Sequence, residues 1–284
     1  MPKPKTKTTT KSKTTTKARK YRYTSRRHDK HKLYEISVQC PEADVDFLDG
    51  AYKKANKRRP VTLMEDFCGT SLLSRRWVES REGRTAIGVD LDPDVLEWAR
   101  RQNLAPLGDR AKDITLVEKS VLDVRRPKVD VRVGFNFSYR IFQDRDVLKA
   151  YFKAARASLK PGGMFVIDLH GGPDAQQEVV EKKKFAGFKY VWEQGELNPI
   201  DQRMLCYIHF EFPDRSAARR AFVYDWRLWG MMELRDVMAS AGFSKTEVYW
   251  EGTDPKTEEG DGVFVKKKKA ENDPSWIAYI VAWL

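Results

Sequence analysis

From about residue 29 onward, short runs of apolar residues alternate with segments in which apolar residues recur every three or four positions. The runs have the length and the Val, Ile and Leu content of strands buried in a parallel sheet. They lie at 61–64, 86–89, 129–134 and 164–168. Because the periodic segments between them predict helices, the pattern indicates an α/β fold with helices on both faces of the sheet.

Several predicted helices have ends that can be placed in the sequence. Asp92 is a typical N-cap, and Pro93 follows at the first helical position, where its missing N–H costs nothing. A second helical segment at 147–159 is stopped by a Pro-Gly-Gly sequence. Residues 33–52, which precede the first strand, predict one or two short helices.

After the fifth strand the pattern changes to alternating apolar and polar residues, which is typical of antiparallel strands. The predicted strands lie at 189–193, 204–212 and 220–226. We expect the whole segment, 173–230, to be a lid inserted over the carboxyl ends of the parallel strands, where open α/β sheets bind ligands.

Candidate chemistry lies in the loop after the first strand. The segment 64–71 (Met-Glu-Asp-Phe-Cys-Gly-Thr-Ser) places an acidic pair and small residues before a helix. Gly69 lacks a Cβ, so it permits a positive φ and the close approach of a ligand. Asp90 ends the second strand, where a carboxylate can bind both hydroxyls of a ribose. The Lys-Ser/Thr pair of a Walker loop and the Gly-x-Gly-x-x-Gly of nicotinamide-binding enzymes are both absent.

This order of features resembles the class I S-adenosylmethionine-dependent methyltransferases. Residues 64–71 match the family's first motif, a strand with an acidic residue and then Gly-x-Gly-x-Gly, with Phe67 and Ser71 at the outer glycine positions. Residues 159–163 (Leu-Lys-Pro-Gly-Gly) match its turn into strand five, and the resemblance covers about residues 61–170. It implies a doubly wound, seven-stranded, mostly parallel Rossmann-like sheet, here with the antiparallel lid inserted after strand five. It also implies S-adenosylmethionine as cofactor, S-adenosylhomocysteine as product, and no metal.

The resemblance assigns roles to the strand ends. Glu65 would lie near the methionine amino group, Asp90 would hold the ribose, and Asp123 would lie beside the adenine amino group. The free N–H groups of the helix that follows the loop would face the methionine carboxylate. The predicted cofactor residues are Glu65, Phe67, Cys68, Gly69, Thr70, Asp90, Leu91, Asp123, Val124 and Asn136.

Residues that bind the methyl acceptor are expected at the strand ends and on the lid, because the protein mainly aligns the reacting groups and excludes water. The candidate catalytic residues are His170 and Tyr139; the pKa of histidine suits a base for a hydroxyl or a protonated amine. A hydrogen-bonded turn residue is an equally good interpretation of His170, and Arg227 is a candidate partner for a carboxylate or phosphate. The predicted acceptor-binding residues are Tyr34, Ser138, Trp226, Arg227 and Trp229.

The net charge of +12 is concentrated at the N-terminus. Residues 1–32 contain 13 Lys and Arg against one acid, whereas the rest of the chain has 40 of each sign. The Lys/Thr-rich segment cannot bury enough surface to fold, so we expect disorder at 1–28 and weak binding of nucleic acid or another polyanion through 1–32. The neutral remainder argues against a catalytic domain that grips a nucleic-acid backbone.

The cysteine content and the lengths of the apolar runs limit the kinds of site and the cellular location that are expected. Three cysteines (Cys40, Cys68, Cys206) are too few and too scattered for a disulfide framework or a zinc site. No apolar run has the length of a membrane span, so we expect no membrane association and a cytoplasmic protein, or a nuclear one in a eukaryote. The run Lys266–Lys269 follows an acidic stretch and is interpreted as a solvated loop.

The sequence favours N- or O-methylation of a small molecule by direct in-line transfer. Asn136-Phe137-Ser138-Tyr139 lacks the prolines of the enzymes that methylate base amino groups, and no cysteine follows a proline as in cytosine-carbon enzymes. Two alternatives stay open: a methyltransferase for RNA or a ribosomal protein that uses the basic tail, and a non-catalytic scaffold that binds the cofactor.

The chain is predicted to divide into five segments. These are a disordered basic tail (1–28), a helical cap (29–60), the cofactor-binding half (61–172), the lid (173–230) and the C-terminal completion of the sheet (231–284).

Overall fold

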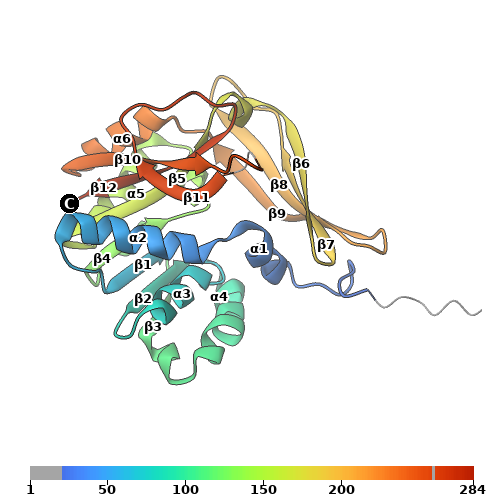
Figure 1. Cartoon of the computed structure of the whole chain (residues 1–284), viewed down its shortest axis with the longest axis horizontal. Coiled ribbons are helices and arrows are strands. Elements are labelled where there is room, and N and C mark those ends of the chain that lie inside the picture. Colours follow the sequence, from blue (N-terminus) through green and yellow to red (C-terminus); the bar gives the residue numbers. More distant parts are fainter. Residues whose placement is uncertain (1–20, 258–259) are drawn as a thin grey trace, which may run out of the picture.

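The computed structural model describes residues 21–257 and 260–284, and it contains a large central sheet between helices and a second sheet beside it (Figure 1). The α-helices are α1 (Lys30–Val38), α2 (Pro41–Asn56), α3 (Leu72–Ser80), α4 (Pro93–Ala99), α5 (Arg145–Ala157) and α6 (Met231–Ser240). The shorter helical segments are η1 (Arg100–Leu104), η2 (Ala105–Asp113), η3 (Ser138–Ile141) and η4 (Pro173–Gln176). Residues 1–20 of the predicted tail lie outside the described residues. No helix within the described residues is long and apolar enough to cross a membrane.

The central sheet has the order β11-β10-β12-β5-β4-β1-β2-β3. Its strands are β1 (Thr62–Asp66), β2 (Thr85–Asp90), β3 (Ile114–Glu118), β4 (Val129–Gly134), β5 (Leu159–Gly171), β10 (Lys245–Thr253), β11 (Gly260–Lys266) and β12 (Trp276–Trp283). The first five strands are mutually parallel, and β12 runs antiparallel between β5 and β10. The predicted mostly parallel α/β sheet is therefore confirmed. Its winding reverses between β1 and β4, the point at which such sheets bind ligands.

The sheet has eight strands among the described residues, and the prediction of seven was wrong. The additional strand, β11, pairs with the edge of β10, and its Lys266 begins the run that we interpreted as a solvated loop. Phe264 explains the pairing, because its ring stacks on Tyr279 at 3.8 Å and lies 5.7 Å from Phe47 of α2. Because charged residues surround Phe264, the sequence pattern did not indicate that its ring packs against the core.

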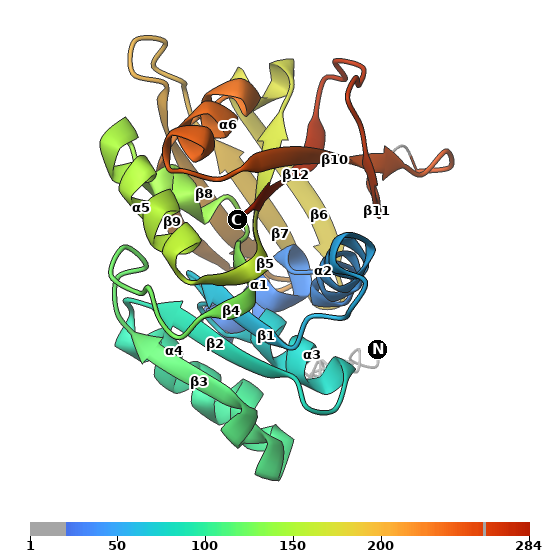
Figure 2. The same cartoon turned by 90° about the vertical axis from the view of Figure 1, so that its left-hand side faces the viewer.

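Two hydrophobic cores lie on opposite faces of the central sheet, and Figure 2 shows their helical layers. The helices α2 and α3 pack on one face, where Tyr52 and Trp77 are fully buried. The helices α5 and α6 pack on the other, around Tyr151, Phe152 and Met238. Because both faces are covered, the strands are mainly apolar, as the short apolar runs in the sequence predict, and the charged residues that they bury, such as Asp130 and Arg132, are paired.

The second sheet follows β5 and is an antiparallel meander in the order β6-β7-β8-β9. Its strands are β6 (Val179–Phe185), β7 (Phe188–Gln194), β8 (Arg203–Glu211) and β9 (Ala217–Arg227). The three strands predicted in this segment correspond to β7, β8 and β9. The sequence pattern did not predict β6, because Glu181 and the three lysines after it are exposed and give the strand no apolar face. Figure 1 shows this sheet projecting beyond the central sheet, with α1 between the two.

Residues 21–28, which we expected to be disordered, contact the second sheet. The ring of Tyr23 lies edge-on to Phe188 at 5.9 Å, and the ring of His28 lies 5.3 Å from Phe212. The Ser25 N–H donates to the Ser216 hydroxyl at 2.8 Å. The ordered chain therefore begins before Asp29, because two aromatic rings interrupt the Lys/Thr composition of the preceding segment.

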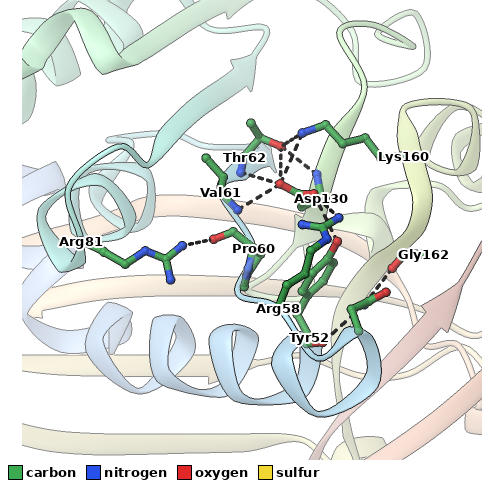
Figure 3. Close-up of polar contacts among 10 residues, drawn as sticks. Tyr52, Arg58, Pro60, Val61, Thr62, Arg81, Asp130, Lys160 and Gly162 are labelled. Carbon is green, nitrogen blue, oxygen red and sulfur yellow. Dashed lines mark hydrogen bonds and ion pairs between the residues drawn. The ribbon is translucent and has the colours of Figure 1, made fainter.

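The amino ends of the parallel strands are joined by hydrogen bonds to Asp130 of β4 (Figure 3). The backbone N–H groups of Val61 and Thr62 each donate to its carboxylate at 3.0 Å, and Arg58 and Lys160 form ion pairs with it at 3.0 and 3.3 Å. These contacts hold the pKa of the buried Asp130 carboxyl well below its ordinary value of 3.8. The network therefore stabilises the edge of the sheet opposite the carboxyl ends.

Replacing Asp130 with alanine is expected to lower the free energy of unfolding by about 2–3 kcal/mol, because several partly buried donors lose a buried, charged acceptor. The wild-type contribution should be complete above the unfolded pKa near 3.8 and should decline as the pH falls below it, because the folded carboxyl titrates lower. Urea unfolding at pH 7 and at pH 3.5 measures both effects. The exposed Glu97→Ala variant is the control, and an equal loss in the two variants at pH 7 would contradict the assignment.

Candidate functional site

The loop after β1 has the backbone conformation of a glycine-rich turn, although it contains a single glycine. Phe67, Gly69 and Ser71 have φ values of +53°, +49° and +59°. These are the three positions at which the resembled motif has glycine. Left-handed φ costs a non-glycine residue about 1–2 kcal/mol, so the packing of the loop must hold Phe67 and Ser71 in place.

That packing is visible for both residues. The ring of Phe67 turns into the α5 side of the sheet and lies 5.7 Å from Tyr151 and 5.9 Å from Phe142. Ser71 is fully buried, and the loop lies so close to β2 that a Cβ on Gly88 would come within 2.9 Å of the Cys68 sulfur. By contrast, a Cβ added to Gly69 would meet no atom within 4 Å. The space above Gly69 is therefore open to a ligand.

Asp90 at the end of β2 faces this loop. Its Oδ2 accepts a hydrogen bond from the Gly69 N–H at 2.8 Å, and its Oδ1 accepts one from the Asp92 N–H at 3.0 Å. Each carboxylate oxygen keeps a lone pair for a further donor. The next residue, Leu91, is 66% exposed, although it is a large apolar side chain.

Glu65 lies beneath the loop and is buried. Its Oε2 accepts hydrogen bonds from the N–H and the hydroxyl of Ser74 in α3, at 2.9 and 2.6 Å. Burial nevertheless raises the pKa of its carboxyl to about 8. A cation next to Glu65 would restore its charged form.

Asp123 and Val124 lie in the loop between β3 and β4. Asp123 is exposed and lines a shallow groove over β2 and β3 together with Lys119. The Val124 carbonyl accepts a hydrogen bond from Arg132 of β4 at 2.7 Å, and Arg132 also binds Asp66 at 2.7 Å. This buried ion pair therefore fixes the loop against the sheet.

Helix α1 covers the loop after β1. The Nδ2 of Asn103 donates both to the Glu35 carboxylate at 2.6 Å and to the Thr70 carbonyl at 2.8 Å. On its other side, α1 contacts the second sheet, where the ring of Tyr34 lies 4.9 Å from that of Phe222. The helix therefore joins the loop to the second sheet.

A cavity of 540 Å³ lies between α1, the carboxyl ends of β4 and β5, and the second sheet. Aromatic side chains dominate its walls. Four predicted site residues line it: Tyr34, Asn136, His170 and Trp226. The other aromatic residues of the lining are Phe137, Tyr190, Trp192 and Tyr224.

Asp168 of β5 holds the turn that forms the floor of this cavity. Its carboxylate accepts hydrogen bonds from the N–H groups of Asn136 and Phe137 at 2.7 and 2.9 Å. Both of these residues have left-handed φ values, +57° and +55°. Burial raises the pKa of the Asp168 carboxyl to about 7. The carboxyl thus stabilises a strained turn at the end of β4.

The two candidate catalytic residues lie in different environments. His170 lines the cavity, and its Nε2 lies 3.0 Å from the Ser275 hydroxyl. Burial, with a smaller effect of Arg140, lowers the pKa of its imidazole to about 4, so the ring is neutral at pH 7. Tyr139 is fully buried in the α5 core and does not line the cavity. Its side chain points to the core because the turn at 136–137 reverses the chain before η3.

Three of the predicted acceptor-binding residues lie outside the cavity lining. The Ser138 hydroxyl donates to the Phe135 carbonyl at 2.8 Å. Arg227 stacks 3.6 Å over the ring of Trp229 and forms an ion pair with Glu233 at 2.8 Å. Trp229 is 1% exposed and donates to the Phe142 carbonyl at 3.0 Å. These contacts join the end of β9 to α6 rather than form a binding wall.

Sequence reasoning did not select several residues that the structure places at the cavity. Arg140, one position after the predicted run 136–139, lines it, as do Tyr190 and Trp192 of β7. The sequence could have indicated Tyr190 and Trp192, because residues two positions apart in a strand lie on the same face of the sheet. Asp168 gave no signal beyond its position near the end of a strand.

No protein-family model matches the chain, and no curated protein matches it in sequence. Solved structures match it in fold. An S-adenosylmethionine-dependent methyltransferase from Clostridium acetobutylicum ATCC 824 has a TM-score of 0.62 and 19% identity, over 89% of this chain and 96% of that chain. CalS10, an amino pentose methyltransferase from Micromonospora echinaspora solved with bound cofactor, has a TM-score of 0.61 and 15% identity, over 89% and 95%. KedS8, a sugar N-methyltransferase from Streptoalloteichus sp ATCC 53650, has a TM-score of 0.60 and 15% identity, over 100% and 98%. The chain therefore has the fold of the class I S-adenosylmethionine-dependent methyltransferases, as predicted.

Proposed function

We propose that this protein is an S-adenosylmethionine-dependent methyltransferase that methylates a nitrogen or oxygen atom of a small molecule bound in the aromatic cavity. One observation carries the proposal: an open loop with a carboxylate facing it lies at the same end of the parallel strands as the aromatic-lined cavity. Asn136 belongs both to the predicted cofactor residues and to the cavity lining. A donor at the loop and an acceptor in the cavity would therefore meet at the end of β4.

The residues at the loop fit the cofactor. The open space above Gly69 accepts its amino-acid part, and the free lone pairs of Asp90 accept the ribose hydroxyls. The exposed side chain of Leu91 offers an apolar surface to the adenine. Two buried hydroxyls of the loop, those of Thr70 and Ser71, have no hydrogen-bond partner within the described residues. Such unpaired groups are expected where a ligand supplies the partner.

When bound, the cofactor supplies an electrophilic methyl group. The chain orients the acceptor between aromatic rings, and α1 and the second sheet cover part of the cavity. In this assignment the second sheet is the lid predicted for 173–230. His170 lines the cavity, but its lowered pKa of about 4 makes the imidazole a weaker proton acceptor than the sequence predicts. Asp168 has an indirect, positioning role, because it holds the backbone of Asn136 and Phe137 in place.

The names of the structural neighbours support a small acceptor. CalS10 is described as an amino pentose methyltransferase and KedS8 as a sugar N-methyltransferase. The cavity of 540 Å³ is in the range of pockets that bind molecules of drug size. By contrast, among the residues that line it, Arg140 is the one Lys or Arg, which does not favour a polynucleotide.

The proposal is tested with methyl-labelled cofactor and fractionated cell extract. The label is expected in the metabolite fraction, and a variant that lacks residues 1–20 should retain this activity. Label in RNA or protein that disappears with the truncation would support the polyanion alternative instead. Cofactor binding without transfer to any fraction would identify a scaffold.

Replacing Asp90 with alanine is expected to weaken cofactor binding about tenfold, or ~1.4 kcal/mol, because a charged hydrogen-bond acceptor is lost. Isothermal calorimetry with S-adenosylhomocysteine measures the change. The control is Asp94→Ala, since Asp94 is an exposed acid in the first turn of α4. Unchanged affinity in a folded Asp90→Ala protein would remove Asp90 from the site.

A further inference from the structure

Arg140 is a buried cation without a carboxylate partner. Its side chain is carried by η3 and is 2% exposed, and among the described residues no carboxylate forms an ion pair with it, although Asp168 lies near enough to interact with it electrostatically. Its Nη2 donates to the His170 carbonyl at 2.7 Å, and its enclosed Nε has no hydrogen-bond partner. Burying a charge in this state costs several kcal/mol, so such a residue is expected where a ligand completes the pair.

The position of Arg140 directs it to the cavity. Its guanidinium carbon lies 4.9 Å from the ring centroid of Phe137 and 5.6 Å from that of Trp226, and all three residues line the cavity. The ring nitrogen of Trp226 is a second enclosed donor without a partner. Two unpaired donors on one wall indicate a place for an acceptor of hydrogen bonds that also carries negative charge.

Asp168 beneath the cavity floor interacts electrostatically with Arg140, but burial raises the pKa of its carboxyl to about 7, so at pH 7 it offsets the charge of Arg140 only in part. His170 is neutral at pH 7, because burial and the neighbouring Arg140 lower the pKa of its ring. The acidic lining residues Asp174, Glu178 and Glu181 are all exposed, so water screens them. The inner part of the cavity is thus positive, whereas its acidic groups are solvated.

We propose that the acceptor carries a carboxylate or phosphate group, which Arg140 binds as a bidentate partner at the inner wall of the cavity. This inference rests on the proposed function. It assigns to Arg140 the anion recognition that the sequence pattern had placed at Arg227, which is already paired with Glu233. The planar fork of arginine matches either anion, and the rings of Phe137 and Trp226 hold the fork in one orientation.

Matched probes test the charge directly in the wild-type protein. The probes are 4-aminobenzoate, 4-aminophenylphosphonate and the neutral 4-aminobenzamide, each titrated in the presence of S-adenosylhomocysteine and followed by tryptophan fluorescence. At least one of the charged probes is expected to bind about tenfold more tightly than the amide. The better of the two identifies the kind of anion. Equal affinities for all three probes would overturn the proposal.

Variants then locate the effect. Arg140→Met should bind the charged probes no better than the amide, whereas Arg140→Lys should retain part of the preference. The control is Arg203→Met, because Arg203 lies on β8 in an exposed pair with Asp225 and does not line the cavity. A preference that persists in Arg140→Met would also overturn the proposal. If Arg140→Met does not fold, the wild-type comparison decides alone.

The same measurements separate this inference from the proposed function, because probe binding needs no methyl transfer. An anion preference together with no transfer to any extract fraction would leave the subsite in place and remove the methyltransferase proposal. A labelled metabolite that an anion exchanger does not retain would overturn the inference and leave the methyltransferase proposal intact.

Discussion

Replacing Arg132 with methionine is expected to lower the free energy of unfolding by about 3–5 kcal/mol, because the change leaves a buried carboxylate without its partner. Arg132 and Asp66 are both fully buried and are joined at 2.7 Å. The guanidinium also donates to the carbonyls of Val121 and Val124 and to the Ser158 hydroxyl. Urea unfolding at pH 7 measures the loss.

An exposed pair of the same chemistry provides the control. Arg203 and Asp225 lie 2.6 Å apart on the second sheet, and both side chains are more than 40% exposed. Arg203→Met should therefore cost less than about 1 kcal/mol. Removing both buried charges, in Asp66→Asn with Arg132→Met, should be less harmful than Arg132→Met alone. Similar losses in the buried and exposed variants would contradict this account of the core.

The affinity for S-adenosylhomocysteine is expected to rise by up to about tenfold between pH 6 and pH 7. Burial raises the pKa of Glu65 to about 8, so in the unliganded protein its carboxyl is mainly protonated over this range. In the proposed site, the ammonium group of the ligand favours the charged carboxylate, and binding releases a proton. Because deprotonation becomes easier as the pH rises, the affinity should rise with it. The ligand itself keeps its proton over most of this range, since an α-amino group titrates near about 7.7–8.0.

The variant Glu65→Gln should bind more weakly and should lose this pH dependence. Its amide can still accept the hydrogen bonds from Ser74, so the fold is expected to survive. Glu79→Gln is the control, because Glu79 lies on α3 with Ser74, and this variant should keep the wild-type dependence of affinity on pH. Calorimetry at both pH values in two buffers of different ionisation enthalpy measures affinity and proton release together. A wild-type affinity that is the same at both pH values would exclude Glu65 from the ammonium site.

The parallel half of the fold could be predicted from the sequence because both faces of its strands are buried. Their apolar runs and the Asp92-Pro93 helix start leave few alternatives, and Asp92 indeed caps α4 by accepting from Asp94 and Val95. The outermost strands of the two sheets, β6 and β11, were harder to predict. The middle of β6 is a run of four exposed charged residues, and β11 is held by the ring of Phe264 within a charged segment. Such strands pair through the backbone, which leaves little pattern in the side chains.

The candidate site shows the same division. The positions of Glu65 and Asp90 at the carboxyl ends of β1 and β2 could be predicted because a motif fixes them, and their roles toward the cofactor stay predictions. Missing glycines obscured the motif, yet the backbone keeps its left-handed φ at Phe67 and Ser71. By contrast, Arg140 and Tyr139 are neighbours in sequence, and only tertiary packing decides which one lines the cavity. Contacts between residues 30 or more positions apart, such as Asp168 with Phe137, cannot be predicted from the local sequence pattern.

A crystal structure with S-adenosylhomocysteine is the most direct test of the central claim, that the edge of the sheet at β1, β2 and β4 holds the methyl donor. We predict that the ribose hydroxyls lie within hydrogen-bond distance of Asp90, that the adenine contacts Leu91, and that the sulfur faces the aromatic cavity. Ligand density elsewhere on the protein, or none between Gly69 and Asp90 at saturating concentration, would contradict the claim.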